Sequence, residues 1–316
     1  MWEQVVSLLG SPLMQRALVA AVLVGAAAPV VGTFLVQRRQ ALMGDGIGHV
    51  ALTGVAVGWL VGSWASVAPA GSLAVPGAVV AAVVGAVTIE LVRERGRTSG
   101  DLALAIMFYG GIAGGVLLIK VAGGTNANLM SYLFGSISTV SAADLWWTAG
   151  LAALVLAVGV GRRQALFAAR HAEEFARASG LPVRLLSMLV ATLAALTVTI
   201  AMRVVGLLLV SALMIVPVAV AQLLCRSFGR TMALASTIGV TVSVVGLAVT
   251  YWNDVPPGAT IVVLAIGLYA VTAAVHPLVV RRRAAGDPHP DLRDDVVVTA
   301  GDDDCAPQAV DPGPRT

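Results

Sequence analysis

The feature that most constrains the fold is a series of apolar runs of about 20 residues along most of the chain. That length is what an α-helix needs to cross a hydrocarbon core about 30 Å thick. The composition agrees, because 58% of the residues are hydrophobic and 12% are charged, whereas soluble globular domains carry about 25% charged residues. The sequence therefore predicts an all-α bundle that spans a membrane several times.

We place nine such runs between residues 17 and 280, with eight possible because the sixth and seventh share a short turn. An amphipathic segment, 1–16, precedes them. The polar tail, 281–316, is expected to be disordered because it has little apolar surface to bury. The segment 129–136 is too short to span and is expected to be interfacial or re-entrant. The nine expected spans cover about 17–36, 46–63, 73–92, 102–120, 145–161, 185–202, 204–224, 232–251 and 258–279.

The distribution of basic residues predicts the orientation of these spans. The loops after the first, third, fifth, seventh and ninth spans carry fifteen of the 20 Lys and Arg residues, whereas the alternate loops carry three. Basic loops stay in the cytoplasm. We therefore expect the N-terminus outside and the C-terminus inside. Near the cytoplasmic end of the third span, Glu90 lies close enough to Arg93 and Arg95 to pair with them.

The candidate functional site is the pair Asp45 and His49, at the mouth of the second span. Residues four apart share one face of a helix, and ionisable side chains at membrane depth usually have a function. An oxygen and a nitrogen ligand suit Zn, Mn or Fe(II) better than Cu(I). Two ligands hold a metal only weakly, which suits a conduit. The alternative is that Asp45 merely caps the helix.

Glycine and proline mark positions where spans can approach or bend. Gly44 and Gly54 leave room for close helix contact or for local unwinding beside the candidate site. Pro217 should kink the seventh span. We assign hinge or packing roles to Gly44, Gly54, Gly206 and Pro217.

The longest internal cytoplasmic loop, 162–183, is the second candidate for function. Residues 164–180 have the spacing of a short amphipathic helix that stops at Gly180, before Leu181 and Pro182. Such a helix could dock a soluble partner. It could equally lie on membrane lipid, which the five arginines between residues 162 and 184 would favour.

Several activities are excluded by missing motifs. The chain has no Gly-x-x-x-x-Gly-Lys-Ser/Thr loop and therefore cannot bind ATP through a P-loop. It also lacks His-Glu-x-x-His, Gly-x-Ser-x-Gly and any basic and aromatic stripe for nucleic acid. We expect a transport subunit without catalytic residues, not an enzyme.

Several motifs resemble those of bacterial ABC permeases for zinc, manganese or iron. The stretch from Gly32 to His49 resembles the Gly-Thr-Phe-Leu and Met-Gly-Asp-Ala-x-x-His signature of these permeases. Further similarities follow in order along about residues 14–280. They include Leu133-Phe134-Gly135-Ser136, residues 174–180, the stretch from Val205 to Pro217, and Pro256-Pro257-Gly258-Ala259.

The resemblance implies a type II ABC importer in a bacterial plasma membrane. Its partners would be a second copy of this chain, two cytoplasmic ATPase subunits and an extracytoplasmic metal-binding protein. The cargo would be a divalent metal, with no permanently bound cofactor. The family's metal positions correspond to Asp45 and His49, and its coupling loop to about 166–182. The coupling residues would be Glu173, Glu174, Phe175, Ala176 and Gly180.

Two departures from the family pattern bear on this assignment. Thr53 stands where a proline before glycine is usual, and Ala172 where an aspartate often precedes the coupling helix. Two other functions stay open. A permease for siderophores or cobalamin would have a similar bundle, and an ion-coupled secondary carrier would need no ATPase.

Overall fold

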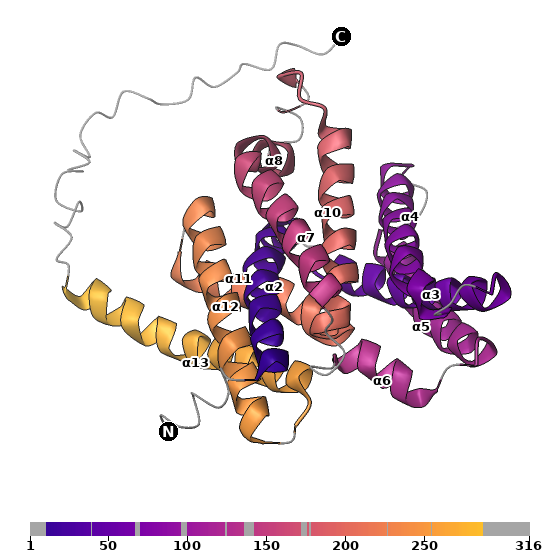
Figure 1. Cartoon of the computed structure of the whole chain (residues 1–316). Helices are drawn as coiled ribbons and strands as arrows, with labels where there is room; N and C mark the ends of the chain where they lie inside the picture. Colours follow the sequence, from indigo (N-terminus) through magenta and orange to yellow (C-terminus); the bar gives the residue numbers. More distant parts are fainter. Residues whose placement is uncertain are drawn as a thin grey trace, which may run out of the picture. The chain divides into compact units, whose positions relative to one another are not determined.

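Every regular element that the computed structural model describes is helical (Figure 1). The described residues are 11–38, 40–66, 70–95, 100–123, 125–135, 142–171, 176, 178–225, 227–253 and 255–286. The expected all-α class is confirmed for this part of the chain. The helices are α2 (Pro12–Gln37), α3 (Met43–Trp64), the 3-10 helix η1 (Ala70–Leu73), α4 (Ala74–Arg95), α5 (Gly100–Val121), α6 (Asn126–Phe134), α7 (Ala142–Gly161), α8 (Arg163–His171), α10 (Val183–Val204), α11 (Leu207–Leu224), α12 (Phe228–Trp252) and α13 (Pro257–Gly286).

Six helices of the described part are long and apolar enough to cross a membrane. They are α2, α3, α4, α5, α12 and α13. Shorter apolar helices over Leu145–Gly161, Val183–Thr199 and Leu209–Leu224 coincide with the expected fifth, sixth and seventh spans. Each expected span thus has a helix, and the count of nine crossings stays a prediction. At the boundaries, α2 already begins at Pro12 and α13 continues to Gly286, and the tail beyond lies outside the described residues.

Residues up to Ala274 form one compact unit, and residues from Val275 onward form another. In the first unit, α2 packs against α7, α10, α11 and α12, whereas α3 packs against α4, α5, α10 and α11. The buried core follows these contacts, with Phe34 and Leu35 on α2 and Ile47 on α3 each no more than 2% exposed. Both helices are surrounded by neighbours, which explains why they are the most buried of the six long spans.

Glycine lets the helices come into backbone contact. A methyl group at Gly25 on α2 would lie 2.8 Å from the carbonyl oxygen of Gly239 on α12. The same holds between Gly54 on α3 and Gly77 on α4, where the added carbon would meet a carbonyl oxygen. Small residues serve this role in lipid, where hydrophobic burial does not drive association.

At one end of this unit, three connections meet through glycine. We call this contact of Gly135, Gly206 and Gly258 the glycine junction. Gly135 follows α6 with φ +75°, and Gly206 separates α10 from α11 with φ +94°. A methyl group at Gly258 would lie 2.6 Å from the carbonyl oxygen of Phe134. All three connections belong to the loops expected outside the cell, so the alternation of spans is consistent with this contact.

Candidate functional site

Asp45 lies in the first turn of α3. The N-cap of this helix is Leu42, which makes no side-chain cap hydrogen bond, and its carbonyl accepts the N–H of Gly46 at 3.1 Å. Asp45 is therefore the third residue of the helix, and the alternative interpretation, in which it serves as the N-cap, is wrong. The cause is that α3 begins at Met43, before the apolar run. A carboxylate in the first turn is still favoured by the helix dipole.

His49 follows one turn later and is buried, with 5% of its surface exposed. Its Nδ1 atom has no hydrogen-bond partner in the described part of the protein. The imidazole meets the ring of Phe108 on α5 edge to face, with 4.5 Å between the ring centroids. A buried polar atom without a partner costs about 1–3 kcal/mol. A bound cation or donor at Nδ1 would remove that cost.

Helix α5 approaches the backbone of α3 at this histidine. A methyl group at Gly111 would lie 2.6 Å from the carbonyl carbon of His49. One turn beyond, the hydroxyl of Thr53 donates to the carbonyl oxygen of Gly111 at 2.8 Å. The departure of Thr53 from the family pattern thus has a local role, because its side chain links α3 to α5. Helix α3 runs unbroken past this position.

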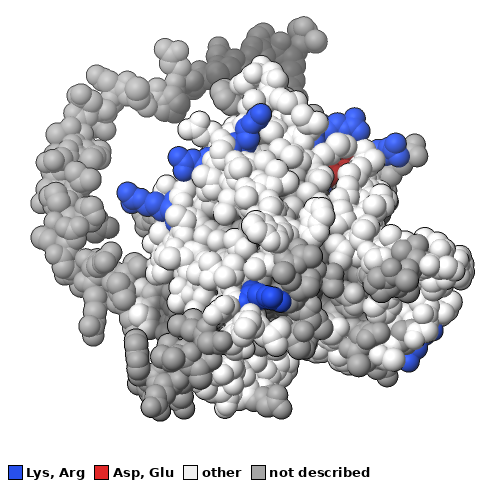
Figure 2. Space-filling model, in the orientation of Figure 1, with Lys and Arg blue, Asp and Glu red and all other residues white. Residues whose placement is uncertain are grey.

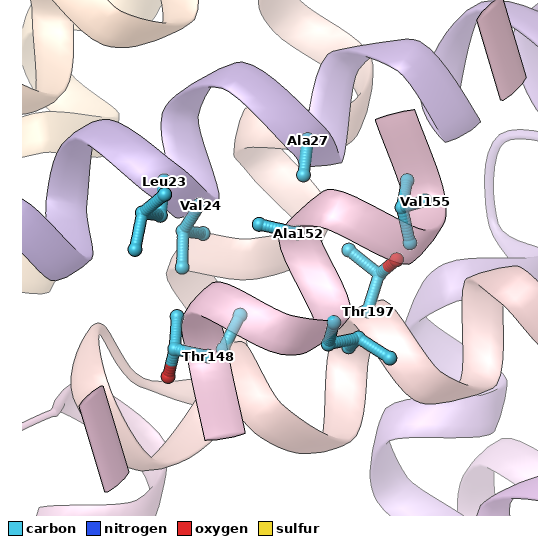
Figure 3. A pocket seen from close by; sticks show the side chains of 9 residues that line it. Leu23, Val24, Ala27, Thr148, Ala152, Val155 and Thr197 are labelled. Carbon is cyan, nitrogen blue, oxygen red and sulfur yellow. The ribbon is translucent and has the colours of Figure 1, made fainter. Parts of the chain in front are cut away.

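The described side chains do not complete a metal site. Among them, no group of three or more His, Cys, Asp and Glu could hold a metal ion. The small cavity between α2, α7 and α10 is elsewhere and has about 10 Å³, room for about one water. Figure 3 shows its largely apolar lining. Asp45 and His49 therefore stand as a pair of candidate ligands, without a third His, Cys, Asp or Glu beside them among the described residues.

The four residues assigned to hinges or packing have different surroundings. Gly54 is required by close contact with α4, whereas a methyl group at Gly44 would only touch the Met214 sulfur at 3.6 Å. Gly206 belongs to the glycine junction, and Pro217 is a buried residue inside α11. Local unwinding of α3 near Gly44 and Gly54 is absent from this structure, since both lie within the continuous helix.

The candidate coupling loop is described in part. Its first segment forms α8, and Ala176 is helical and fully buried. Gly180 has φ +75°, and the N–H of Leu181 donates to the carbonyl of Ala176 at 3.0 Å. This is the geometry of a glycine-terminated helix, so the predicted stop at Gly180 is confirmed. Glu173, Glu174 and Phe175, like Ala172, lie outside the described residues.

A network of ion pairs lies at the end of the molecule opposite the glycine junction. The side chain of Glu90 is 6% exposed and lies 3.0 Å from Arg93 and 3.7 Å from Arg38, measured between carboxylate oxygen and guanidinium nitrogen. Nearby, Glu94 on α4 pairs with Arg184 on α10 at 2.9 Å. The predicted pairing of Glu90 with Arg93 is confirmed. The links to α2 and α10 were not predicted, because sequence spacing gives no sign of contacts between distant helices.

Basic side chains gather at this same end. Figure 2 shows most of the visible Lys and Arg along the edge that carries α8 and the ends of α4 and α10. The described parts of the connections after the expected first, third, fifth and seventh spans therefore lie at one end of the unit. This arrangement agrees with the alternation that the basic residues predict.

Comparisons with known proteins identify the family. The model of the ABC 3 transport family matches residues 11–276. The manganese transport system membrane protein MntC of Halalkalibacterium halodurans is 34% identical over 270 residues, covering 85% of this chain and 89% of that protein. The chelated iron transport system membrane protein YfeD of Yersinia pestis is 31% identical, covering 84% and 86%.

Solved structures agree with this assignment. PsaBC from Streptococcus pneumoniae, determined in complex with Fab, superposes with a TM-score of 0.76 at 32% identity, covering 85% of this chain and 94% of that one. An inward-facing putative metal-chelate type ABC transporter gives a TM-score of 0.61 at 16% identity, which shows a shared fold. The bundle, its motifs and these matches together show that the chain belongs to the ABC 3 transport family.

Proposed function

We propose that this chain is the membrane-spanning permease subunit of an ATP-driven importer for a divalent transition metal, with the ion passing Asp45 and His49. The observation that carries the proposal is the buried imidazole of His49, whose Nδ1 has no partner in the described part, one helical turn from a carboxylate. Relatives named for manganese and iron transport support the cargo class. We assign ATP hydrolysis to separate cytoplasmic chains.

The remaining partners follow from the same proposal. Two copies of the chain form the pore, two ATPase subunits bind the cytoplasmic loop 166–182, and an extracytoplasmic protein delivers the metal. Within the loop, the buried Ala176 and the helix stop at Gly180 support a fixed docking element. An ion held by only two protein ligands leaves readily, which suits transit rather than storage.

The test is metal uptake by vesicles that contain the permease with its ATPase subunits. We expect Asp45→Ala and His49→Ala to reduce ATP-dependent uptake of Mn, Zn and Fe(II) to the level of empty vesicles, because each removes one of two ligands. Thr241→Ala is the control, since its exposed hydroxyl bonds only to its own helix. Co-purified ATPase should be unchanged in all variants. Normal uptake by Asp45→Ala with an intact complex would contradict the site.

The same preparations separate the two rival functions. A secondary carrier would take up metal under an ion gradient without any ATPase subunit. A permease for bulky chelates would transport the chelated metal and would tolerate loss of both ligands. A stoichiometric ATPase together with uptake of the free ion supports the proposed importer.

A further inference from the structure

A groove at the basic end of the molecule lies outside the metal path. It has a volume of about 420 Å³, within the usual range for small-ligand sites. One wall is the start of α8 and the other is the start of α12. The lining consists of Arg163, Gln164, Phe167, Ser227, Phe228, Gly229 and Arg230.

The groove is held in place by aromatic contacts. The ring of Phe228 lies 4.9 Å from that of Phe167 and 5.4 Å from that of Phe34, between centroids. Phe34 is 2% exposed and belongs to the core. The two walls are therefore fixed to each other and to α2.

Positive charge is concentrated in this groove, and no acidic side chain is among the residues that line it. A methyl group at Gly229 would lie 3.6 Å from Nη1 of Arg163, so this guanidinium lies over the first turn of α12. The start of a helix is itself positive, and Arg230 adds a second exposed guanidinium. Neither arginine has an ion pair among the described residues. Ser227, the N-cap of α12, makes no side-chain cap hydrogen bond.

We propose that this groove binds the phosphate of an anionic phospholipid headgroup. The groove lies where α7 and α11 end and α12 begins, at Gly161, Leu224 and Phe228. Leu224 is 55% exposed there, as expected beside acyl chains. Basic pockets between membrane helices on the cytoplasmic side bind such headgroups. This inference does not depend on the metal that is transported.

The test measures lipid binding to the purified full-length chain in detergent, by native mass spectrometry and by melting temperature. The probes are phosphatidylglycerol, phosphatidylcholine and inorganic phosphate. We expect Arg163→Gln/Arg230→Gln to weaken phosphatidylglycerol binding about tenfold or more. Arg16→Gln/Arg162→Gln is the control, because it removes the same charge from two exposed arginines outside the groove.

A second variant separates loss of the site from misfolding. Gly229→Asp places a carboxylate beside Arg163, so it should raise the melting temperature without lipid and remove the preference for phosphatidylglycerol. Equal binding by all variants overturns the proposal. Equal stabilisation by inorganic phosphate assigns the groove to a free anion instead. Loss of ATPase co-purification by the groove variant, with lipid binding unchanged, assigns the groove to a protein contact.

Discussion

The hydroxyl of Thr53 joins two helices at the candidate metal site. It donates to Gly111 on α5 at 2.8 Å, and it also lies 3.4 Å from the carbonyl oxygen of His49 on its own helix. In the same turn, Gly111 allows the two backbones to touch. The contact of the imidazole with Phe108 on α5 is therefore supported by a hydrogen bond between the same two helices, one turn away.

Replacement of Thr53 by valine tests this link. Valine keeps the shape of threonine and removes the donor, so we expect the free energy of unfolding to fall by about 0.5–1 kcal/mol. We also expect weaker metal uptake, because α5 can then shift relative to His49. Melting temperature and vesicle uptake measure the two effects. Thr88→Val is the control, since the Thr88 hydroxyl is exposed and bonds only to Val84 of its own helix. Equal losses in both variants would contradict the link.

The buried carboxylate of Glu90 gives a second prediction at this scale. Glu90→Ala removes the anion between the guanidinium groups of Arg38 and Arg93. Because the pair is largely buried, we expect a loss of about 2 kcal/mol or more. Glu94→Ala should cost less than about 1 kcal/mol, since its partner Arg184 is 64% exposed. The melting temperatures of the two variants measure this difference. A larger loss of stability for Glu94→Ala than for Glu90→Ala would contradict the prediction.

Among the elements, the break between α10 and α11 is the most constrained. Gly206 has φ +94°, and a methyl group on its Cα would collide with the backbone of Gly135. The stop at Gly180 has a similar φ of +75° but open space around it. Both glycines thus adopt a positive φ that would strain any other residue, and they differ in packing.

Alanine at each glycine separates these two causes. Gly180→Ala should cost about 1 kcal/mol from backbone strain alone. Gly206→Ala should cost clearly more, because the added carbon also meets the backbone of Phe134 and Gly135. Folded yield and melting temperature measure the difference. Similar values for both variants would show that the close packing at Gly206 is unimportant.

Local features of these elements could be predicted from sequence, and contacts between helices could not. Apolar length located the spans, and the Glu90–Arg93 pair follows from a spacing of three residues. The start of α3 was expected near residue 46, three residues too late. The helix begins at Met43, and the Leu42 carbonyl accepts its first backbone hydrogen bond, so no capping side chain in the sequence marks this start. The Thr53–Gly111 hydrogen bond depends on the register between α3 and α5, and this register cannot be read from a single sequence.

At the scale of the whole unit up to Ala274, the described connections lie at two ends, and the basic residues predict which end is cytoplasmic. Single cysteines in a chain with Cys225 and Cys305 replaced by serine test that assignment. Asn253→Cys, at the end of α12, should react with a membrane-impermeant maleimide in intact cells. Arg162→Cys, between α7 and α8, should react only after permeabilisation. The reverse pattern would invert the topology.

The glycine junction also determines which part of the bundle can assemble late during biosynthesis. Its three members follow α6, separate α10 from α11, and begin α13. A chain emerging from the ribosome can insert its early helices one by one, but it cannot close this contact until residue 258 has been made. The carbonyls of Phe134 and Val205 therefore lack their contact with Gly258 while α11 and α12 are being synthesised. This end of the unit is thus among the last parts of the nascent chain to assemble.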